Sequence, residues 1–425
     1  MTGAPEAPRG SLLSARGLKL LEFLESNRAR RLAWLALAIY LLGLGVSAAL
    51  RVQGDFAIYY RSGERVLAGL PIYPPDDADR FLYAPIFAVG FAPFALLPRW
   101  LAQLAFFALN AWGLTAFLIG SGIALFGRER VLSAPLIAGP VVLSCIFIGN
   151  NIEHGQINLI VLALCAWAIV RAREGRAASS GAMIAAAGLI KPFAILAALY
   201  LLWRRRFASI LWAALAVAIL LAAPIAVFGI HGTIDQTSAY VQSILSMSDR
   251  FRTMITNQSA VAMVSRLMAA MAGNEAVASG RFPLIEGMVL ELLFAVSVFL
   301  RLRDDSATDE TANDRFGLAM LFALMAGFAP ISWKSYFAAL LVPYMLLLDE
   351  LALARSEPRS GYVPLAWLLL ALSALLNFVP GRQVNRLALF YSSTFWSSFC
   401  VLLAVGCLYS DRRSAGAPEL ARPAA

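Results

Sequence analysis

Residues 100–126 read WLAQLAFFALNAWGLTAFLIGSGIALF and contain no charged side chain. Because a membrane-spanning helix needs about 20 mostly apolar residues, this run is long enough to cross a bilayer. The pattern, which recurs along the chain, predicts an all-α, polytopic membrane protein with about 12 transmembrane helices. The other runs lie near 32–50, 84–98, 133–149, 156–171, 181–203, 207–229, 284–300, 316–331, 333–348, 362–380 and 388–409.

The composition of the whole chain supports this class. Hydrophobic residues make up 60% of the 425 residues and charged residues 14%, against about 45–50% and about 25% in a soluble domain. A soluble enzyme is therefore excluded, and so is a disordered chain, which needs low hydrophobicity. The net charge is +9, but the arginines cluster at the ends of apolar runs, as at Arg204, Arg205 and Arg206. This is the positive-inside pattern of membrane proteins, so we expect membrane lipids as partners and no nucleic acid.

The arginine-rich segments also predict the orientation. With 12 spans, the N-terminal segment 1–31 and the tail 410–425 lie in the cytoplasm, and residues 32–409 form one transmembrane domain. Two long outer loops, 51–83 and 230–283, then lie outside. The remaining arginine-rich segments on the inner side are 203–207, 301–315 and 349–361.

One group of arginines conflicts with this topology. Arg171, Arg173 and Arg176 fall outside if 181–203 crosses the membrane once. In the alternative, 181–203 is a hairpin broken at Lys191-Pro192, and 84–98 dips into the membrane without crossing. The hairpin moves these arginines inside and leaves both outer loops outside.

The most informative polar stretch is 54–60, which reads GDFAIYY and follows the first apolar run directly. Asp55 is thus expected at the outer membrane surface, where a carboxylate can face a cavity and act as a general base. Tyr59 and Tyr60 can shape a pocket beside it. The alternative is an interfacial acid in water, or a helix N-cap.

Neither a metal nor a cofactor is predicted. Asp76-Asp77-Ala78-Asp79 resembles an acidic metal motif, but solvated loop acids are the more common meaning of such a pattern. The chain has two histidines, His154 and His231, so a histidine-built metal site is not expected. It has neither a Walker loop nor a GxGxxG motif, so the sequence gives no sign of nucleotide binding.

Lys191 lies within an apolar run, next to the helix-breaking Pro192. A lysine at such a depth is costly unless it is paired or faces a wet cavity. We therefore expect its ammonium to meet an internal acid or an anionic ligand. The alternative is a lysine that snorkels to a nearby interface.

The second outer loop carries Arg250, Arg252 and Arg266 around the amides of Asn257 and Gln258. Arginines matched to amides suit a phosphate or a sugar, so these three are our candidates for phosphate binding, together with Lys191. An amphipathic helix lying on the surface is the alternative. Gln156, which opens an apolar run, is either a site residue or a helix-packing amide.

At this point the chain resembles glycosyltransferase family 87, the polyprenyl-phosphate-mannose-dependent mannosyltransferases of the GT-C fold. The matching motifs occur in family order over roughly residues 30–345. They are Asp55-Phe56 with Tyr59-Tyr60, Leu67-Ala68-Gly69 with Tyr73, Tyr83-Ala84-Pro85 with Pro93, Gly155-Gln156-Ile157-Asn158, Ile190-Lys191-Pro192, Asn257-Gln258-Ser259 and Ile331-Ser332-Trp333.

The resemblance implies an inverting, metal-independent transfer of a sugar from a polyprenyl-phosphate donor to a glycolipid or glycan acceptor. Mannose is the sugar that it suggests. It implies a catalytic aspartate in the first outer loop, which is Asp55 here, and an active site on the outer face of a bacterial inner membrane. Family members often carry a histidine after the Ser-Trp pair, where this chain has Lys334. The motifs supply our substrate-pocket candidates: Tyr59, Tyr60, Tyr83, Gln156, Asn257, Gln258, Trp333 and Lys334.

Three other functions remain as alternatives. A lipid-linked-sugar flippase or other transporter is also polytopic and basic, but the chain has no evident two-fold repeat. An envelope glycan polymerase or ligase usually carries its key basic and histidine residues in a large late outer loop, whereas the marked acid here is in the first. A non-catalytic membrane scaffold is the third, since fold alone does not fix function.

Overall fold

The computed structural model describes residues 22–50, 54–74, 76–77, 80–273, 310–327, 331–354 and 362–414. In this part of the chain the regular structure is helical, as predicted, and there is no strand. The predicted span 284–300 lies outside the described residues, as do 1–21 and 415–425. The helices are α2 (Asn27–Ala49), α3 (Gly54–Leu67), α4 (Pro85–Ala95), α5 (Arg99–Phe126), α6 (Ala134–Glu153), α7 (Asn158–Arg173), α8 (Ala177–Ile190), η1 (Pro192–Ala194), α9 (Ile195–Trp203), α10 (Phe207–Ala222), α11 (Ile225–Arg252), α12 (Ala260–Ala272), α15 (Glu310–Gly327), η2 (Lys334–Leu340), α16 (Leu341–Ala354), α17 (Tyr362–Asn377), α18 (Arg382–Phe390) and α19 (Ser393–Ser414).

The predicted count of 12 membrane spans is not confirmed. Among the described residues, five helices are long and apolar enough to cross a membrane, and the number rises to seven if two bent helix pairs each count as one span. Several predicted runs form helices that are too short. For example, the 11 residues of α4 rise only about 16 Å, roughly half of a hydrocarbon core about 30 Å thick. This agrees with the alternative in which 84–98 dips without crossing.

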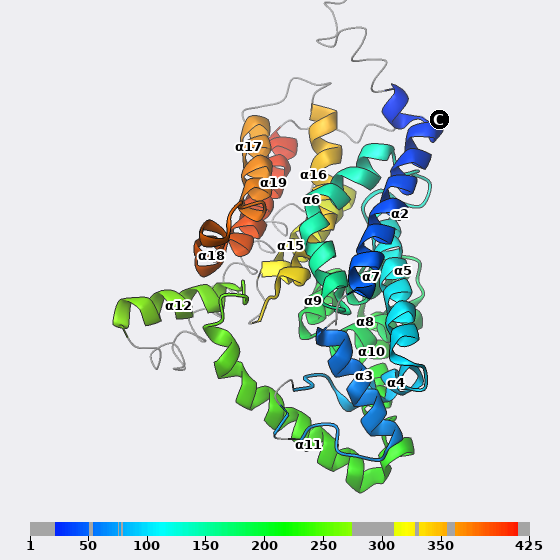
Figure 1. Ribbon diagram of the computed structural model, residues 1–425. Helices are drawn as coiled ribbons and strands as arrows, with labels where there is room; N and C mark the ends of the chain where they lie inside the picture. The colour runs from blue at the N-terminus through cyan, green and yellow to red at the C-terminus, as the bar shows by residue number, and fades with distance from the viewer. Residues whose placement is uncertain are drawn as a thin grey trace, which may run out of the picture.

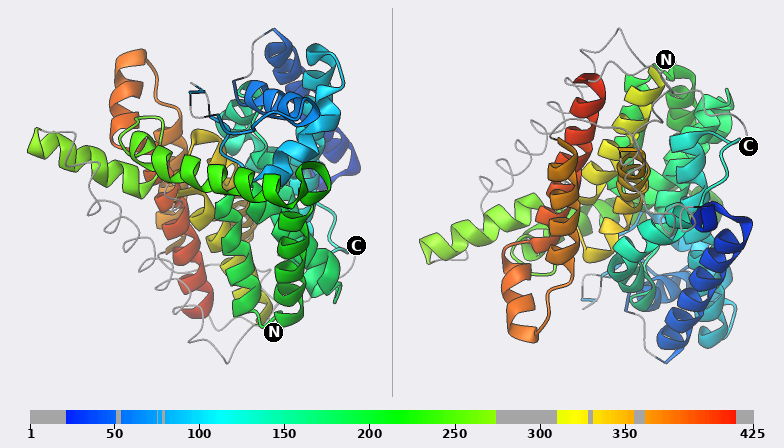
Figure 2. Two further views of the ribbon diagram at one scale, coloured as in Figure 1. Left: turned by 90° about the horizontal axis from the view of Figure 1, so that it is seen from below. Right: turned by 90° about the horizontal axis from the view of Figure 1, so that it is seen from above.

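The helices run between two ends of the molecule (Figure 1). We call one the arginine end, where ion pairs join the ends of α5, α7, α9, α16 and α19 and the start of α15. The other we call the α3 end. There α3, α4 and α11 gather, and α11 crosses the face that is seen from below (Figure 2, left). The ion pairs of the arginine end are Arg128–Glu174, Arg130–Asp349, Arg171–Glu174, Arg173–Asp314, Arg176–Glu174, Arg204–Asp314, Arg315–Asp349, Arg315–Glu350 and Arg412–Glu350.

Residues 177–203 fold back on themselves as a hairpin, which disagrees with 181–203 as one crossing and favours the alternative topology. Arg173, just before α8, donates a 3.2 Å hydrogen bond to the hydroxyl of Tyr200 near the end of α9. Arg173 and Arg204 also share the carboxylate of Asp314, at 2.5 and 2.9 Å. Both ends of the α8–α9 unit therefore lie at the arginine end. The turn lies at Lys191, whose extended backbone (φ −138°, ψ 118°) ends α8 before Pro192, since the residue preceding a proline is disfavoured in a helix.

The first predicted outer loop contains an amphipathic helix, α3, packed tightly on α4. Phe56 and Tyr59 point into the core and are fully buried. A Cβ atom added to Gly63 would lie 2.7 Å from the carbonyl oxygen of Phe91, so only glycine allows these two helices to approach so closely.

The second predicted outer loop, 230–283, is also largely helical where it is described, and it packs on the first. The side chain of Gln236 on α11 accepts a 3.0 Å hydrogen bond from the backbone of Ile72. The rings of Tyr240 and Tyr73 lie 5.9 Å apart. α11 itself is kinked at Gly229, where φ is +66°. The pair formed by α10 and α11 bends by 88°.

Candidate functional site

Asp55 lies in the first turn of α3, at the α3 end. Its backbone N–H donates a 3.1 Å hydrogen bond to the carbonyl of His154, which ties the start of α3 to the end of α6. The side chain is half-buried. Within the described part of the chain its carboxylate makes neither a hydrogen bond nor an ion pair. The local fold therefore fixes the position of Asp55 through its backbone and leaves its carboxylate available.

The three tyrosines predicted for the pocket have different surroundings. The hydroxyls of Tyr59 and Tyr83 share a 2.6 Å hydrogen bond, and the Tyr59 ring is fully buried against Phe87 and neighbouring rings. Tyr60 donates a 2.8 Å hydrogen bond to the carbonyl of Leu97. Tyr59 and Tyr60 therefore hold α3 against its neighbours, whereas Tyr83 connects this cluster to Lys191.

Lys191 lies at the tip of the α8–α9 hairpin. Its ammonium donates a 3.1 Å hydrogen bond to the hydroxyl of Tyr336. It also lies 4.7 Å from the centre of the Tyr83 ring and 5.0 Å from that of Tyr336, within the range of cation–π attraction. In the described part of the chain its polar partners are tyrosines and include no carboxylate, so the expected internal acid is not found there.

Tyr83 brings Asp55 and Lys191 into one electrostatic environment. Burial raises the pKa of the Tyr83 phenol, the Lys191 ammonium opposes that rise, and the Asp55 carboxylate adds to it. Asp55 also contributes to the raised pKa of Tyr59, after burial and Tyr83. The carboxylate and the ammonium thus both affect the pKa of one phenol, although Asp55 and Lys191 are far apart in the sequence.

Gln156 belongs to a buried network of amides. Its side-chain oxygen accepts a 2.7 Å hydrogen bond from Asn158 and a short one from Ser335. Asn158 also donates to Ser335, at 2.9 Å. Asn151 continues the network by donating a 3.0 Å hydrogen bond to Asn110. These contacts join α5, α6, α7 and η2 and keep the segment that bears Tyr336 in place.

Asn257 and Gln258 are fully buried and bind backbone groups. The oxygen of Asn257 accepts hydrogen bonds from the N–H groups of Ser259 (3.1 Å) and Ser332 (2.9 Å). The Gln258 amide donates to the carbonyls of Ile255 (2.6 Å) and Leu389 (2.9 Å). Their contacts therefore favour a structural role, joining the segment before α12 to the segment before η2 and to the end of α18.

Arg266 is buried, and all three of its nitrogens donate within the protein. The acceptors are the carbonyls of Met254 (2.7 Å), Asn257 and Phe390 (both 2.9 Å) and the hydroxyl of Ser392 (2.5 Å). Its phosphate-binding role stays a prediction, but these contacts favour a clamp between α12 and the turn before α19. Arg250 and Arg252 lie at the end of α11, and their side chains are outside the described part of the chain.

Lys334 lines a cavity of about 460 Å³ at the start of η2. Arg382 and the amides of Asn377 and Asn385 also line it. The neighbouring Trp333 packs edge-on against Phe251 at 5.3 Å. The cavity thus collects two cations, Lys334 and Arg382, and it is large enough to hold a phosphate group.

The acidic motif at 76–79 has a structural partner. Asp77 forms a bidentate ion pair with Arg65 at 2.5 and 3.1 Å, and these contacts lower the pKa of its carboxyl group. Asp79 lies outside the described residues.

Sequence reasoning missed Tyr336, Ser335, Asn158 and Arg382. Asn158 lies in the Gly155–Asn158 motif without a predicted role, and Ser335 and Tyr336 come directly after the candidate Lys334. No pattern in the sequence indicates that Tyr336 would be the partner of Lys191, because an acid or an anionic ligand was the expected partner. Arg382 lies in a stretch without a motif, so nothing in the sequence marked it.

The model of glycosyltransferase family 87 matches residues 81–328. A polyprenol-phosphate-mannose-dependent alpha-(1-2)-phosphatidylinositol mannoside mannosyltransferase from Mycolicibacterium smegmatis is 25% identical over 400 residues, which cover 85% of each chain. The family match spans more than half of the sequence, and several apolar helices accompany it. The chain therefore belongs to glycosyltransferase family 87 and is an integral membrane glycosyltransferase.

Proposed function

We propose that this protein transfers a sugar, with mannose as the first candidate, from a polyprenyl-phosphate donor to a hydroxyl group of a glycolipid or glycan. The observation that carries the proposal is that the Asp55 carboxylate and the Lys191 ammonium both affect the pKa of the Tyr83 phenol, and that Lys191 lies 4.7 Å from the centre of its ring. Asp55 has a half-buried carboxylate without a hydrogen-bond or ion-pair partner in the described residues. Lys191 is a buried cation whose described partners are neutral phenols. A base for an acceptor hydroxyl and a cation for a phosphate are the two groups that this transfer needs.

In the proposed reaction, Asp55 accepts the proton of the acceptor hydroxyl as its oxygen forms a bond to the anomeric carbon. The bond from that carbon to the donor phosphate breaks on the opposite side, and its electron pair leaves with the phosphate oxygen. Configuration is therefore inverted. The leaving phosphate needs no proton from a general acid, so the pair of carboxylic acids used by glycoside hydrolases is not required.

Lys191 is the first candidate for binding the donor phosphate. The cavity with Lys334 and Arg382 is the second, because it holds two cations and amide groups within about 460 Å³. Arg250, Arg252 and Arg266 remain candidates from the sequence alone. A phosphate bound by one of these cations is stabilised most as its charge increases during departure.

The distribution of arginines supports an outer location for the site. If the arginine end faces the cytoplasm, in keeping with the positive-inside rule, the α3 end with Asp55 lies on the other side of the membrane. Nucleotide sugars are cytoplasmic, so a transferase working there needs a sugar already carried across on a lipid. The name of the mycobacterial relative, with its polyprenol-phosphate-mannose donor and phosphatidylinositol mannoside acceptor, supports the same donor class.

The test is a transfer assay with the purified full chain in detergent. The donors are radiolabelled polyprenyl-phosphate-mannose and, in a parallel reaction, GDP-mannose, with phosphatidylinositol mannoside as the acceptor. We expect labelled glycolipid from the polyprenyl donor alone. Transfer from GDP-mannose would contradict the proposed donor class. Movement of the lipid donor across vesicle membranes without transfer would favour the flippase alternative.

A further inference from the structure

A second cavity, of about 520 Å³, lies at the arginine end. It is bounded by the C-terminal ends of α5, α7 and α9 and by the start of α15. Its volume falls in the range of about 300–1,000 Å³ that is usual for small-molecule sites. The catalytic proposal above uses none of its residues. Five arginines line it: Arg128, Arg130, Arg173, Arg204 and Arg315.

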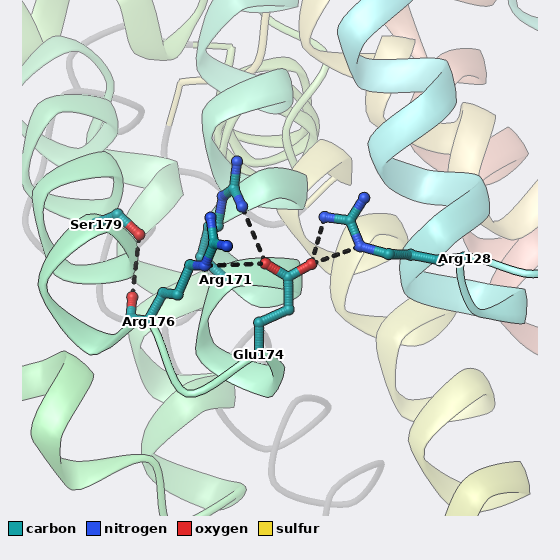
Figure 3. A network of polar contacts seen from close by, with 5 residues as sticks. All are labelled: Arg128, Arg171, Glu174, Arg176 and Ser179. Carbon is teal, nitrogen blue, oxygen red and sulfur yellow. Dashed lines mark hydrogen bonds and ion pairs between the residues drawn. The ribbon is translucent and has the colours of Figure 1, made fainter.

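Two acids, Glu174 and Asp314, also line this cavity, and arginines outnumber them. Glu174 lies between the guanidinium group of Arg128, which follows α5, and those of Arg171 and Arg176 (Figure 3), and it pairs with all three. Asp314 serves both Arg173 and Arg204. A guanidinium has five N–H donors, and each of these carboxylates is shared by two or three of them. The wall therefore carries an excess of positive charge and N–H donors, which suits an additional anion.

Tryptophans next to the cavity indicate that it lies at the level of the lipid headgroups. The guanidinium carbons of Arg128 and Arg171 lie 5.9 and 5.5 Å from the centre of the Trp167 ring, and that of Arg204 lies 5.3 Å from the Trp203 ring. Tryptophan is enriched at membrane–water interfaces, where its ring meets the headgroups.

The neighbouring surface agrees with this level. Leu202, at the end of α9, and Phe207 and Leu211, on α10, are exposed. Exposed apolar side chains of this size are suited to contact with acyl chains.

We propose that this cavity binds the phosphate headgroup of an anionic membrane phospholipid. Arg128 and Arg173 would bind the phosphate oxygens, because the planar guanidinium matches them with two parallel hydrogen bonds. The remaining wall is apolar and includes Leu125, Phe126 and Val170. A free phosphate ion has no apolar group that could pack against such a wall. A lipid has its glycerol and first methylene groups, which can.

The experiment uses the full chain, purified in a neutral detergent. Phosphatidylglycerol, phosphatidylcholine and inorganic phosphate are titrated separately, and binding is followed by melting temperature and by native mass spectrometry. We expect phosphatidylglycerol to raise the melting temperature saturably and to remain bound. Phosphatidylcholine and inorganic phosphate should do neither. The Arg128→Gln variant should bind phosphatidylglycerol about tenfold more weakly, because it loses a charge-assisted pair of hydrogen bonds.

Arg99→Gln is the matched control, because Arg99 is an exposed arginine at the start of α5, whereas Arg128 follows the end of that helix. It should bind phosphatidylglycerol like the wild type. If the wild-type protein bound phosphatidylglycerol and phosphatidylcholine equally well, this result alone would overturn the proposal. Stabilisation by inorganic phosphate equal to that by the lipid would overturn the lipid assignment, and unchanged binding by Arg128→Gln would overturn the site.

Discussion

Lys191 Nζ and the hydroxyl of Tyr336 lie 3.1 Å apart, although 145 positions separate the two residues in the chain. The contact joins the tip of the α8–α9 hairpin to η2. A buried ammonium is costly unless something compensates its charge. In the described residues a phenol and two aromatic faces provide partial compensation, and no carboxylate completes it. An anionic ligand is therefore the natural counter-ion of Lys191.

The Lys191→Met variant is expected to fold and to lose activity. The substitution keeps an unbranched apolar stem and leaves no buried carboxylate without its cation. A hydrogen bond to a charged group contributes about 1.5–3 kcal/mol, so kcat/KM for the polyprenyl donor should fall at least about tenfold. Steady-state kinetics with a fixed acceptor concentration measure this. A wild-type value would favour the snorkelling alternative.

Tyr336→Phe is the matched variant for Lys191. It keeps the ring beneath the ammonium and removes only the hydroxyl that accepts the hydrogen bond. We expect a smaller loss than for Lys191→Met, because the cation remains. A loss as large as that of Lys191→Met would instead assign the main role to the phenol.

Arg266→Gln is expected to destabilise the protein rather than weaken donor binding. The arginine is buried and donates to the carbonyls of Met254, Asn257 and Phe390. Each buried acceptor left without a donor costs about 1–3 kcal/mol, so unfolding free energy should fall by about 3 kcal/mol or more. Chemical denaturation in detergent measures it, with the exposed Arg386→Gln on α18 as control. Unchanged stability with a raised KM for the donor would support the phosphate-binding role.

The ion pair between Asp77 and Arg65 predicts an acid-sensitive contribution to stability. Hydrogen bonds from Arg65, and its charge, lower the pKa of Asp77 in the folded protein. A lowered pKa stabilises the fold above the unfolded pKa of about 3.9, and the contribution disappears as the pH falls through the folded pKa. The Asp77→Asn variant should thus be less stable at pH 7, by about 1 kcal/mol for a pair that keeps some contact with solvent. Below about pH 4 its stability should approach that of the wild type. A constant difference between pH 3 and pH 7 would contradict this account.

Long apolar runs were predicted well from the sequence, because their signal is local. The run at 100–126 is α5, and that at 133–149 is most of α6. The break at Lys191 was also readable, since proline ends a helix wherever it lies. The sequence does not predict whether α8 and α9, on either side of this break, continue across the membrane or fold back. The contacts of Arg173 with Tyr200 and Asp314 show that they fold back.

The site was harder to predict because a side chain's partner is a property of the fold. Asn257 and Gln258 carry amide groups, which often bind sugars. In the structure, however, Asn257 accepts a hydrogen bond from the backbone of Ser332, and Gln258 donates one to the backbone of Leu389. Residues 230–252 were expected in a mixed loop, but most of α11 lies there, because its polar side chains meet the first outer loop. Asp55 was identified from its position and motif, and its open carboxylate agrees with a role that remains a prediction.

Asp55→Asn provides the sharpest test of the mechanism, and α3 offers a matched control. Glu64 is an exposed acid on the same helix, so Glu64→Gln removes an equal charge without touching the site. Asparagine keeps the shape of Asp55 and cannot accept the proton. Folding should be unaffected, because α3 is tied to α6 through the backbone N–H of Asp55 and not through its carboxylate.

General-base assistance is typically worth about 10²–10⁴-fold, so kcat of Asp55→Asn should fall by about that factor. Donor affinity should remain near the wild-type value, because the missing interaction belongs to the transition state. Glu64→Gln should keep both parameters. The measurement is transfer from polyprenyl-phosphate-mannose under saturating donor, with donor affinity determined separately by equilibrium binding. If the Asn variant turned over at a near-normal rate, Asp55 would be an interfacial acid, and the proton acceptor would have to be sought among other groups at the α3 end.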